Sequence, residues 1–294
     1  MYNPTMTDPP NPIQLLPRST VSLSAGAVAY ADQGSGRTAL FVHGVLVNAD
    51  LWRNTIEGVQ DMRRCIAVDL PAHGATPSDA RADMSLTGLA AMLEELCEVL
   101  DVGEVDLVGN DTGGAVAQVL AARYPERLRT FTLTNCDVHD NFPPEAFRPF
   151  IELAANGEFG PLVAAMAGDM GLARSEAGFG QGYEHPENLP DEVIRSYLGP
   201  FEADSGKGLE RFLTSSTAAE LVAIAPLLAK LEVPTQVLWG TGDIFFEPFW
   251  AERLRAMIPG VERVTEIPGA MLFYPDERAP DLVPHLRTFW ERHG

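Results

Sequence analysis

The segment GNDTG at residues 109–113 combines a carboxylate with the glycine spacing of a tight catalytic turn. It stands where the apolar run VDLVGN ends and the helical pattern GGAVAQVLAARYP begins. A sharp strand-to-helix turn strains its central residue, and flanking glycines avoid Cβ clashes with the neighbouring strand and helix. We therefore expect Asp111 to point into a cavity as a nucleophile, a general base or, when protonated, a general acid. An ordinary helix N-cap aspartate fits the same pattern, and the surrounding segments distinguish the two.

Two other segments suit the same arrangement. An apolar strand closes at FVHG (41–44) and leads into VLVN and the helical start LWRN (51–54). The loop after such a strand supplies a backbone N–H donor to an oxyanion. The backbone N–H groups of Val45 and Thr112 are expected to form this oxyanion hole. Downstream, WGTGD ends another strand with Asp243, either a catalytic acid or a structural hydrogen-bond acceptor. These segments favour an active-site turn over a helix cap.

Other candidate residues surround this turn. Asp137 and His139 follow FTLTNCD at the mouth of the predicted sheet. His139 is the imidazole that the topology brings nearest to Asp111, with a surface loop histidine as the plainer interpretation; Asp137 is an orienting acid or a turn residue. Asn48 is expected to cap the next helix, with substrate contact as the alternative. Phe142 and other aromatic residues that follow it would roof an apolar pocket.

Strand-like runs alternate with helical ones along most of the chain. A hairpin is predicted over 20–31, and single strands are predicted at 39–44, 65–71, 105–111, 131–137, 235–240 and 263–269. Leucines spaced along 86–100 form one helical stripe. This alternation predicts an α/β fold with a mostly parallel, doubly wound sheet. From 140 to 229 the strand pattern gives way to amphipathic helical segments, which predicts a helical insertion.

The sequence resembles the α/β-hydrolase superfamily from residue 20 to 292, through VHG, DLPAHGATPS (69–78), GNDTG, WGTGD and IPGAMLFYPDERAP (267–280). The resemblance implies an eight-stranded sheet in a core of residues 20–139 and 230–294, with a helical cap at 140–229. The start of the chain, which has four prolines and neither Lys nor Arg in its first twelve residues, predicts a loose leader at 1–19. An aspartate in the turn, with HG and LWRN, is similar to haloalkane dehalogenases and epoxide hydrolases rather than to serine esterases. That similarity implies attack by Asp111 on carbon and a covalent ester that an activated water hydrolyses.

The sequence departs from this superfamily at the catalytic base. The base histidine usually follows the last strand as G-x-G-H-F or G-A-G-H-F, and the same frame here reads GAMLF, so that Leu272 takes the histidine's position. General bases contribute ~10²- to 10⁴-fold, and an ester on Asp111 is expected to turn over slowly or accumulate. Haloalkane dehalogenases carry two residues that donate hydrogen bonds to the halide, and Val45 and Thr112 stand at these positions here. Epoxide hydrolases carry the motif HGxP, and Leu46 replaces its proline.

Three functions remain open at this point. The first is an enzyme that hydrolyses an epoxide, a carbon–halogen bond or an ester or lactone through Asp111. The second is a cyclase, isomerase or lyase in which Asp111 moves a proton, and the third is a ligand-binding protein that has kept the pocket. Fold class does not choose among them, because function resides in the site.

The composition and charge of the chain limit the classes of binding partner that we expect. With 294 residues, 46% of them hydrophobic, the chain can bury a sizeable core. Its formal net charge of −20 is spread along the sequence without a basic patch, which disfavours nucleic acid. No apolar stretch approaches the ~18 residues of a bilayer-spanning helix, and the first twelve residues lack a secretion signal, so we expect a cytoplasmic protein without membrane contact. The expected partner is a neutral, hydrophobic small molecule, with neither cofactor nor metal; a homodimer is left open.

Overall fold

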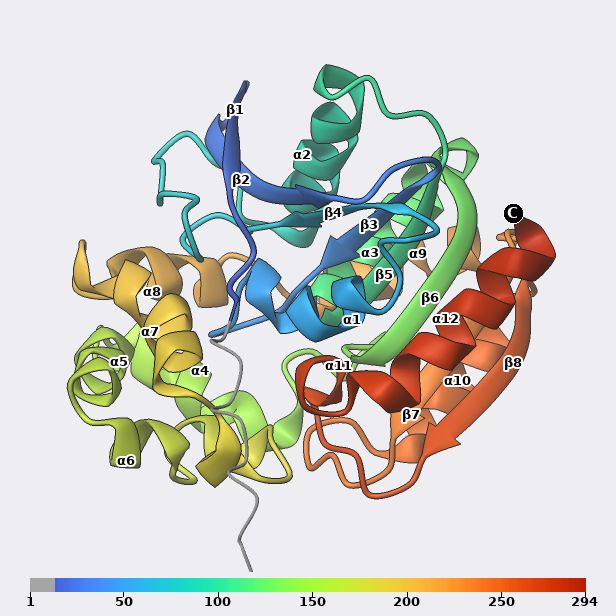
Figure 1. The fold of residues 1–294 in the computed structure, drawn as a ribbon. Helices are drawn as coiled ribbons and strands as arrows, with labels where there is room; N and C mark the ends of the chain where they lie inside the picture. The colour runs from blue at the N-terminus through green and yellow to red at the C-terminus, as the bar shows by residue number, and fades with distance from the viewer. Residues whose placement is uncertain (1–13) are drawn as a thin grey trace, which may run out of the picture.

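The computed structural model describes residues 14–294, in which helices cover both faces of a central eight-stranded sheet (Figure 1). The strand order is β1-β2-β4-β3-β5-β6-β7-β8. Its strands are β1 (Ser19–Leu23), β2 (Gly26–Gln33), β3 (Thr38–Val42), β4 (Arg64–Val68), β5 (Val105–Asp111), β6 (Leu128–Cys136), β7 (Thr235–Gly240) and β8 (Val261–Ile267). The pairs β1–β2 and β2–β4 are antiparallel, and the five remaining pairs are parallel. The predicted α/β fold is confirmed.

The strands at the centre of the sheet have continuous apolar sequences, which suit burial on both faces. Every residue of β3 (TALFV) and of β5 (VDLVGND) is buried. A strand covered by helices on both faces needs apolar side chains on both, which is why these runs do not alternate. Because β3 and β5 are neighbours and parallel, the loops that follow them meet at the same end of the sheet.

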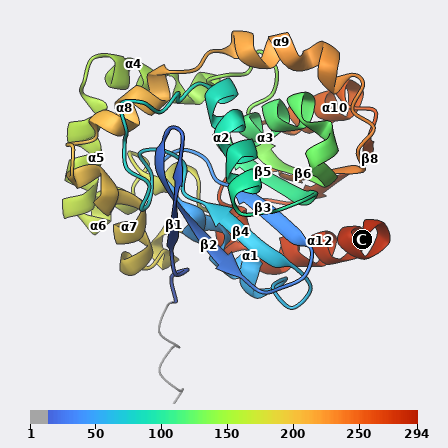
Figure 2. The same cartoon turned by 90° about the horizontal axis from the view of Figure 1, so that it is seen from above.

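The helices form two layers (Figure 2). On one face lie α1 (Arg53–Glu57) and α12 (Ala279–His293), with the short α11 (Tyr274–Glu277) between them. On the other face lie α2 (Leu86–Val99), α3 (Thr112–Arg123), α9 (Ala218–Leu228) and α10 (Pro248–Met257). The stripe predicted for α2 is its buried face. Ser85 caps the N-terminus of this helix, and its side chain accepts a hydrogen bond from the N–H of Gly88.

A group of short helices lies beside the core as a cap (Figure 1). It comprises α4 (Arg148–Ala155), α5 (Phe159–Gly168), α6 (Met170–Arg174), α7 (Asp191–Leu198) and α8 (Lys207–Thr214). Turns of 3-10 helix occur at η1 (Ala49–Trp52), η2 (Pro125–Arg127), η3 (Glu145–Phe147), η4 (Phe179–Gln181), η5 (Pro186–Asn188) and η6 (Gly199–Glu202). The next helix, α9, packs on α3 rather than on the cap, because its buried apolar residues face the core. The cap therefore ends before α9 and not at residue 229.

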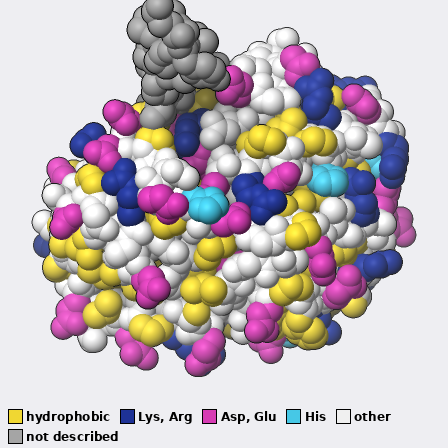
Figure 3. All heavy atoms as spheres, turned by 60° about the horizontal axis from the view of Figure 1, so that its bottom comes forward, with side chains coloured by type: hydrophobic (Ala, Val, Ile, Leu, Met, Phe, Trp, Pro, Cys, Tyr) yellow, Lys and Arg dark blue, Asp and Glu magenta, His cyan; other side chains and the backbone are white. Residues whose placement is uncertain are grey.

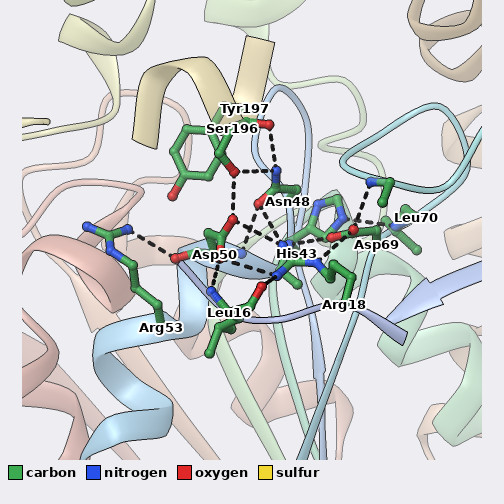
Figure 4. A network of polar contacts seen from close by, with 12 residues as sticks. Leu16, Arg18, His43, Asn48, Asp50, Arg53, Asp69, Leu70, Ser196 and Tyr197 are labelled. Carbon is green, nitrogen blue, oxygen red and sulfur yellow. Dashed lines mark hydrogen bonds and ion pairs between the residues drawn. The ribbon is translucent and has the colours of Figure 1, made fainter. Parts of the chain in front are cut away.

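The residues immediately before β1 are tied to the core (Figure 4). Arg18 forms a hydrogen-bonded ion pair with buried Asp69 at 2.9 Å and a second ion pair with Asp50 at 3.1 Å. The N–H of Leu16 donates to Asp50 at 2.8 Å. The expectation of a loose leader over 1–19 is therefore wrong for its last residues, since buried carboxylates hold Arg18 in place. Residues 1–13 of that leader lie outside the described part of the chain.

The same polar network reaches the cap (Figure 4). Ser196 of α7 donates to Asp50 at 2.6 Å and accepts a hydrogen bond from the side chain of Asn48. Asn48 also caps η1, as predicted, by accepting from the N–H of Asp50 at 2.9 Å. The loop after β3 thus anchors one side of the cap.

The distribution of charged side chains on the surface and the burial of the cysteines agree with what the sequence predicts. On the face shown in Figure 3, Asp and Glu side chains are interspersed with Lys and Arg rather than gathered in one block. The three cysteines, Cys65, Cys97 and Cys136, are buried and unpaired, as predicted. Among residues 14–294, no helix has both the length and the apolarity needed to cross a bilayer.

Candidate active site

Asp111 forms the turn between β5 and α3 and has a strained backbone. Its φ of 55° and ψ of −135° lie in a region that side-chain-bearing residues rarely adopt. A Cβ at Gly113 would lie 2.2 Å from the carbonyl oxygen of His43, so only glycine lets α3 approach the end of β3 this closely. Asp111 is 8% exposed and lines a cavity between the core and the cap. The turn thus has the position expected of a catalytic residue.

Backbone N–H groups hold one side of the Asp111 carboxylate. The N–H of Val45 donates to Oδ2 at 2.7 Å, and the N–H of Thr112, the first residue of α3, also favours the ionised carboxylate. Val45 precedes Leu46, whose positive φ of 66° turns the loop after β3 toward Asp111. Burial raises the pKa of Asp111 to about 6, and the two N–H bonds oppose that rise. At pH above 7 the group is therefore mostly an anion with one oxygen fixed.

Gly44 leaves the space that this carboxylate occupies. A Cβ at Gly44 would lie 2.1 Å from Oδ2 of Asp111, so we expect Gly44→Ala to push the carboxylate away from Val45. Misplacing a reacting group by about 1 Å can cost ~10²-fold, so the reaction of Asp111 with electrophiles should slow by about that factor. Gly103→Ala is the matched control, because a Cβ there meets nothing within 4 Å. Equal reaction rates in the two variants, measured by mass spectrometry, would contradict this role for Gly44.

A second carboxyl group, Asp137, lines the same cavity. It follows β6 directly, and Cys136 is paired with Asp111 across β5 and β6. Thr112 Oγ1 donates to Asp137 Oδ2 at 3.3 Å, whereas Oδ1 is buried and has no hydrogen-bond partner among residues 14–294. Burial, and then the charge of Asp111, raise the pKa of Asp137 well above its ordinary value. Because Asp111 accepts the N–H bond from Val45 and the pKa of Asp137 is raised further by the charge of Asp111, Asp111 ionises first and Asp137 is the member of the pair that retains a proton.

Asp243 lies behind the cavity wall rather than on it. Its Oδ2 accepts a hydrogen bond from Asn135 at 2.8 Å, and its Oδ1 accepts one from the N–H of Phe245 at 2.8 Å. Burial raises its pKa to about 7 against these hydrogen bonds. Asn135 was not predicted; it also bridges β6 to the backbone of Gly240 at the end of β7. The polar residue inside the apolar run FTLTNC was the signal that could have found it.

The cavity wall is predominantly apolar. The cavity volume is about 70 Å³, which is room for a few waters or a small organic group. Its polar lining residues are Asp111, Thr112, Asp137, Gln181 and Ser216. Aromatic rings line much of the remainder, from the cap and from the core: Phe142, Phe147, Phe150, Phe159, Phe179, Phe212, Phe245, Phe246 and Phe273. Leu272, at the position of the superfamily's histidine, also lines it.

None of the six histidines, all within the described residues, lines this cavity. His139 has a positive φ of 54°, and its Nδ1 pairs with Asp140 at 2.9 Å at the surface. The expectation that His139 approaches Asp111 is therefore not met, because the loop turns its ring toward solvent. Asn48, bonded to Ser196 in the cap, does not line the cavity either.

Two buried histidines brace the loops behind the site. His43 donates to the carbonyl of Gly44 at 2.7 Å and accepts the N–H of Leu70 at 3.0 Å. His73 donates to the carbonyl of Pro71 at 3.1 Å. Burial lowers the pKa of both rings to about 3, so both are neutral at physiological pH. Within residues 14–294, no three His, Cys, Asp or Glu residues are grouped as metal ligands would be.

The chain is similar to known proteins over most of its length. A family model described as the alpha/beta hydrolase fold matches residues 39–277. A cis-3-alkyl-4-alkyloxetan-2-one decarboxylase of Shewanella oneidensis is 23% identical, over 94% of this chain and 89% of that protein. A haloalkane dehalogenase of Mesorhizobium japonicum is 36% identical over 123 residues, which cover 41% of this chain and 40% of that protein.

Solved structures agree with this relationship. The epoxide hydrolase CorEH, without ligand, has a TM-score of 0.76 and is 18% identical, over 94% of this chain and 99% of that chain. This likeness shows the fold. The matched span of residues 39–277 contains the Asp111 turn, the loop after β3 and all of β4 to β8. The protein thus belongs to the α/β-hydrolase fold family of enzymes.

Proposed function

We propose that Asp111 is a nucleophile that attacks an electrophilic carbon of a neutral, apolar small molecule and forms a covalent ester. The observation that carries this proposal is the orientation of its carboxylate. The backbone N–H of Val45 holds Oδ2, the N–H of Thr112 favours the ionised form, and the side chain lines an apolar cavity. Oδ1 is then the oxygen that attacks.

The surroundings of Asp111 suit both halves of such a reaction. An apolar cavity solvates a carboxylate poorly, which strengthens its interaction with a reacting carbon. When water later attacks the ester, negative charge develops on Oδ2, which already faces Val45. Fixed donors of this kind stabilise a tetrahedral intermediate without reorganising.

The relatives support the same chemistry. Two of the similar proteins are named for a haloalkane and for an epoxide as substrates. The Shewanella relative is named for an oxetan-2-one, a cyclic ester. Each of these compounds is neutral and contains a carbon atom bonded to a leaving group. We infer that this protein acts on a neutral molecule of that general kind.

Covalent labelling tests the nucleophile. The protein is incubated with 1-bromohexane or styrene oxide, and the peptide that contains residue 111 is analysed by mass spectrometry. We expect the mass of the alkyl group on Asp111 with at least one probe, and none in Asp111→Asn. The absence of adduct from both probes would overturn the nucleophilic role, and an adduct elsewhere would do the same. An enzyme that only moves protons would form no adduct.

The rate of labelling should depend on pH. Because the pKa of Asp111 is about 6, the attacking anion is depleted below that pH. With 1-bromohexane, whose leaving group needs no proton, the rate should rise tenfold per pH unit up to about 6 and then level off. Labelling time courses between pH 4.5 and 8.5 measure this. A rate that does not change across this range would show that ionisation of Asp111 does not control the step.

A further inference from the structure

One buried carboxyl oxygen at the cavity wall, Oδ1 of Asp137, has no role in the reaction proposed for Asp111. Asp137 is 2% exposed, and its Oδ1 has no hydrogen-bond partner among residues 14–294. Leaving a buried polar atom unpaired costs ~1–3 kcal/mol, so it calls for a reason. Its other oxygen accepts from Thr112, the residue that follows Asp111. Asp137 lines the cavity, so this buried oxygen lies at the cavity wall rather than in the core of the sheet.

The environment of Asp137 keeps it protonated. The ionisable groups that face it are Asp111 at the end of β5, Asp243 after β7 and the neighbouring thiol of Cys136. Burial, then the negative charges of Asp111 and Asp243, raise the pKa of Asp137, and neither aspartate can neutralise it. Since Oδ2 accepts a hydrogen bond from Thr112, the proton resides on Oδ1.

We propose that Asp137 donates a proton to the oxygen that leaves carbon when Asp111 attacks, and that the substrates are therefore strained cyclic ethers of the epoxide class rather than haloalkanes. This proposal rests on the nucleophilic role of Asp111 proposed above. A halide leaves as an anion and needs hydrogen-bond donors but no proton. An alkoxide is far more basic, and a carboxylic acid in a water-poor cavity is a suitable donor for it.

The first step balances within the two carboxyl groups. Oδ1 of Asp111 forms a bond to the ring carbon, and the carbon–oxygen bond of the epoxide breaks with its electron pair on the oxygen. The proton of Asp137 transfers to that oxygen. The products are a hydroxyalkyl ester on Asp111 and an ionised Asp137.

The second step uses the same residue as a base. Asp137 takes a proton from water as the water oxygen adds to the carboxyl carbon of Asp111, and the charge on Oδ2 is held by the backbone N–H of Val45. Collapse of this intermediate expels the second alkoxide, which takes the proton of the newly formed Asp111 carboxylic acid. A diol leaves, with Asp111 ionised and Asp137 protonated as before. Asp137 thereby supplies the base that Leu272 does not.

The test compares Asp137→Asn with wild type for two probes whose leaving groups differ. Asparagine resembles the protonated carboxyl group in shape and charge but has no acidic proton. We expect consumption of styrene oxide to slow by at least ~10²-fold, because the proton donor is lost, and labelling of Asp111 by 1-bromohexane to change by less than about threefold. Asp140→Asn is the matched control, because it removes an exposed carboxylate from the same loop, and it should change neither rate.

The outcomes separate this proposal from the nucleophilic role. Equal losses with both probes, or no loss with either, would overturn the role of Asp137 while Asp111 remains the nucleophile. If wild-type Asp111 takes up neither probe, the nucleophilic role itself fails.

The wild-type protein supplies a second measurement should Asp137→Asn not fold. The rate at which it consumes styrene oxide should rise to a maximum and then fall as Asp137 loses its proton at high pH, while the rate of 1-bromohexane labelling levels off and stays level. Parallel profiles for the two probes would overturn the proposal.

Discussion

Asp111→Asn is expected to abolish covalent labelling and turnover, with a loss of at least ~10³-fold. The amide keeps an oxygen that can accept the N–H of Val45, so the turn retains its hydrogen bond, but it lacks the charge needed to attack carbon. The rates of adduct formation with 1-bromohexane and of styrene oxide consumption measure the loss. Residual reaction above a tenth of wild type would exclude the catalytic roles of Asp111.

The same substitution should leave the fold as stable as before, or more stable, at neutral pH. The pKa of Asp111 rises from 3.8 to about 6 on folding, so its favourable contribution is present below pH 3.8 and is lost as the pH rises through 6. At 1.36 kcal/mol per pKa unit, the cost above that pH is about 3 kcal/mol. Denaturant unfolding at pH 8 and pH 4 should show an advantage for Asp111→Asn that shrinks at the lower pH. A strongly lowered melting temperature at pH 8 would mean that Asp111 is kept for stability.

Leu272→His is expected to accelerate hydrolysis of the ester that 1-bromohexane leaves on Asp111 by at least ~10²-fold, the lower end of a general base's contribution. In wild type this ester should persist, because bromide departs without a proton and Asp137 stays protonated. Leu272 lines the same cavity as Asp111, so an imidazole there can reach a water beside the ester. The decay of the adduct mass after removal of the probe gives the hydrolysis rate.

A second substitution separates basicity from polarity at this position. Leu272→Gln introduces a polar side chain without a base, and it should leave the adduct nearly as stable as in wild type. Both variants bury a polar group at a position that is 5% exposed, so their melting temperatures must be compared first. If folded Leu272→His gives no gain over Leu272→Gln, the cavity does not admit the water that hydrolysis requires.

The position of Asp111 was predictable from sequence because it depends on local backbone chemistry. A strand pattern, an aspartate between glycines and a helical pattern follow one another within a few residues. Steric rules for glycine then leave few alternatives for the turn. The order of strands in a parallel sheet likewise brings the loop containing Val45 to the same end as Asp111. These features were settled by short-range spacing and by the alternation of strands and helices.

The remainder of the site was decided by contacts between residues distant in the chain. Whether Asp137 or His139 faces the cavity depends on loop dihedral angles, and the positive φ of His139 sends its ring to the surface. Asn135 and Asp243 are 108 residues apart, and only the pairing of β6 with β7 brings them together. Likewise, a helical pattern identifies α9 as a helix but does not say whether its apolar side packs on the cap or on α3. Residue type fixes which groups can react, whereas side-chain direction and burial arise only when the strands and loops are packed together.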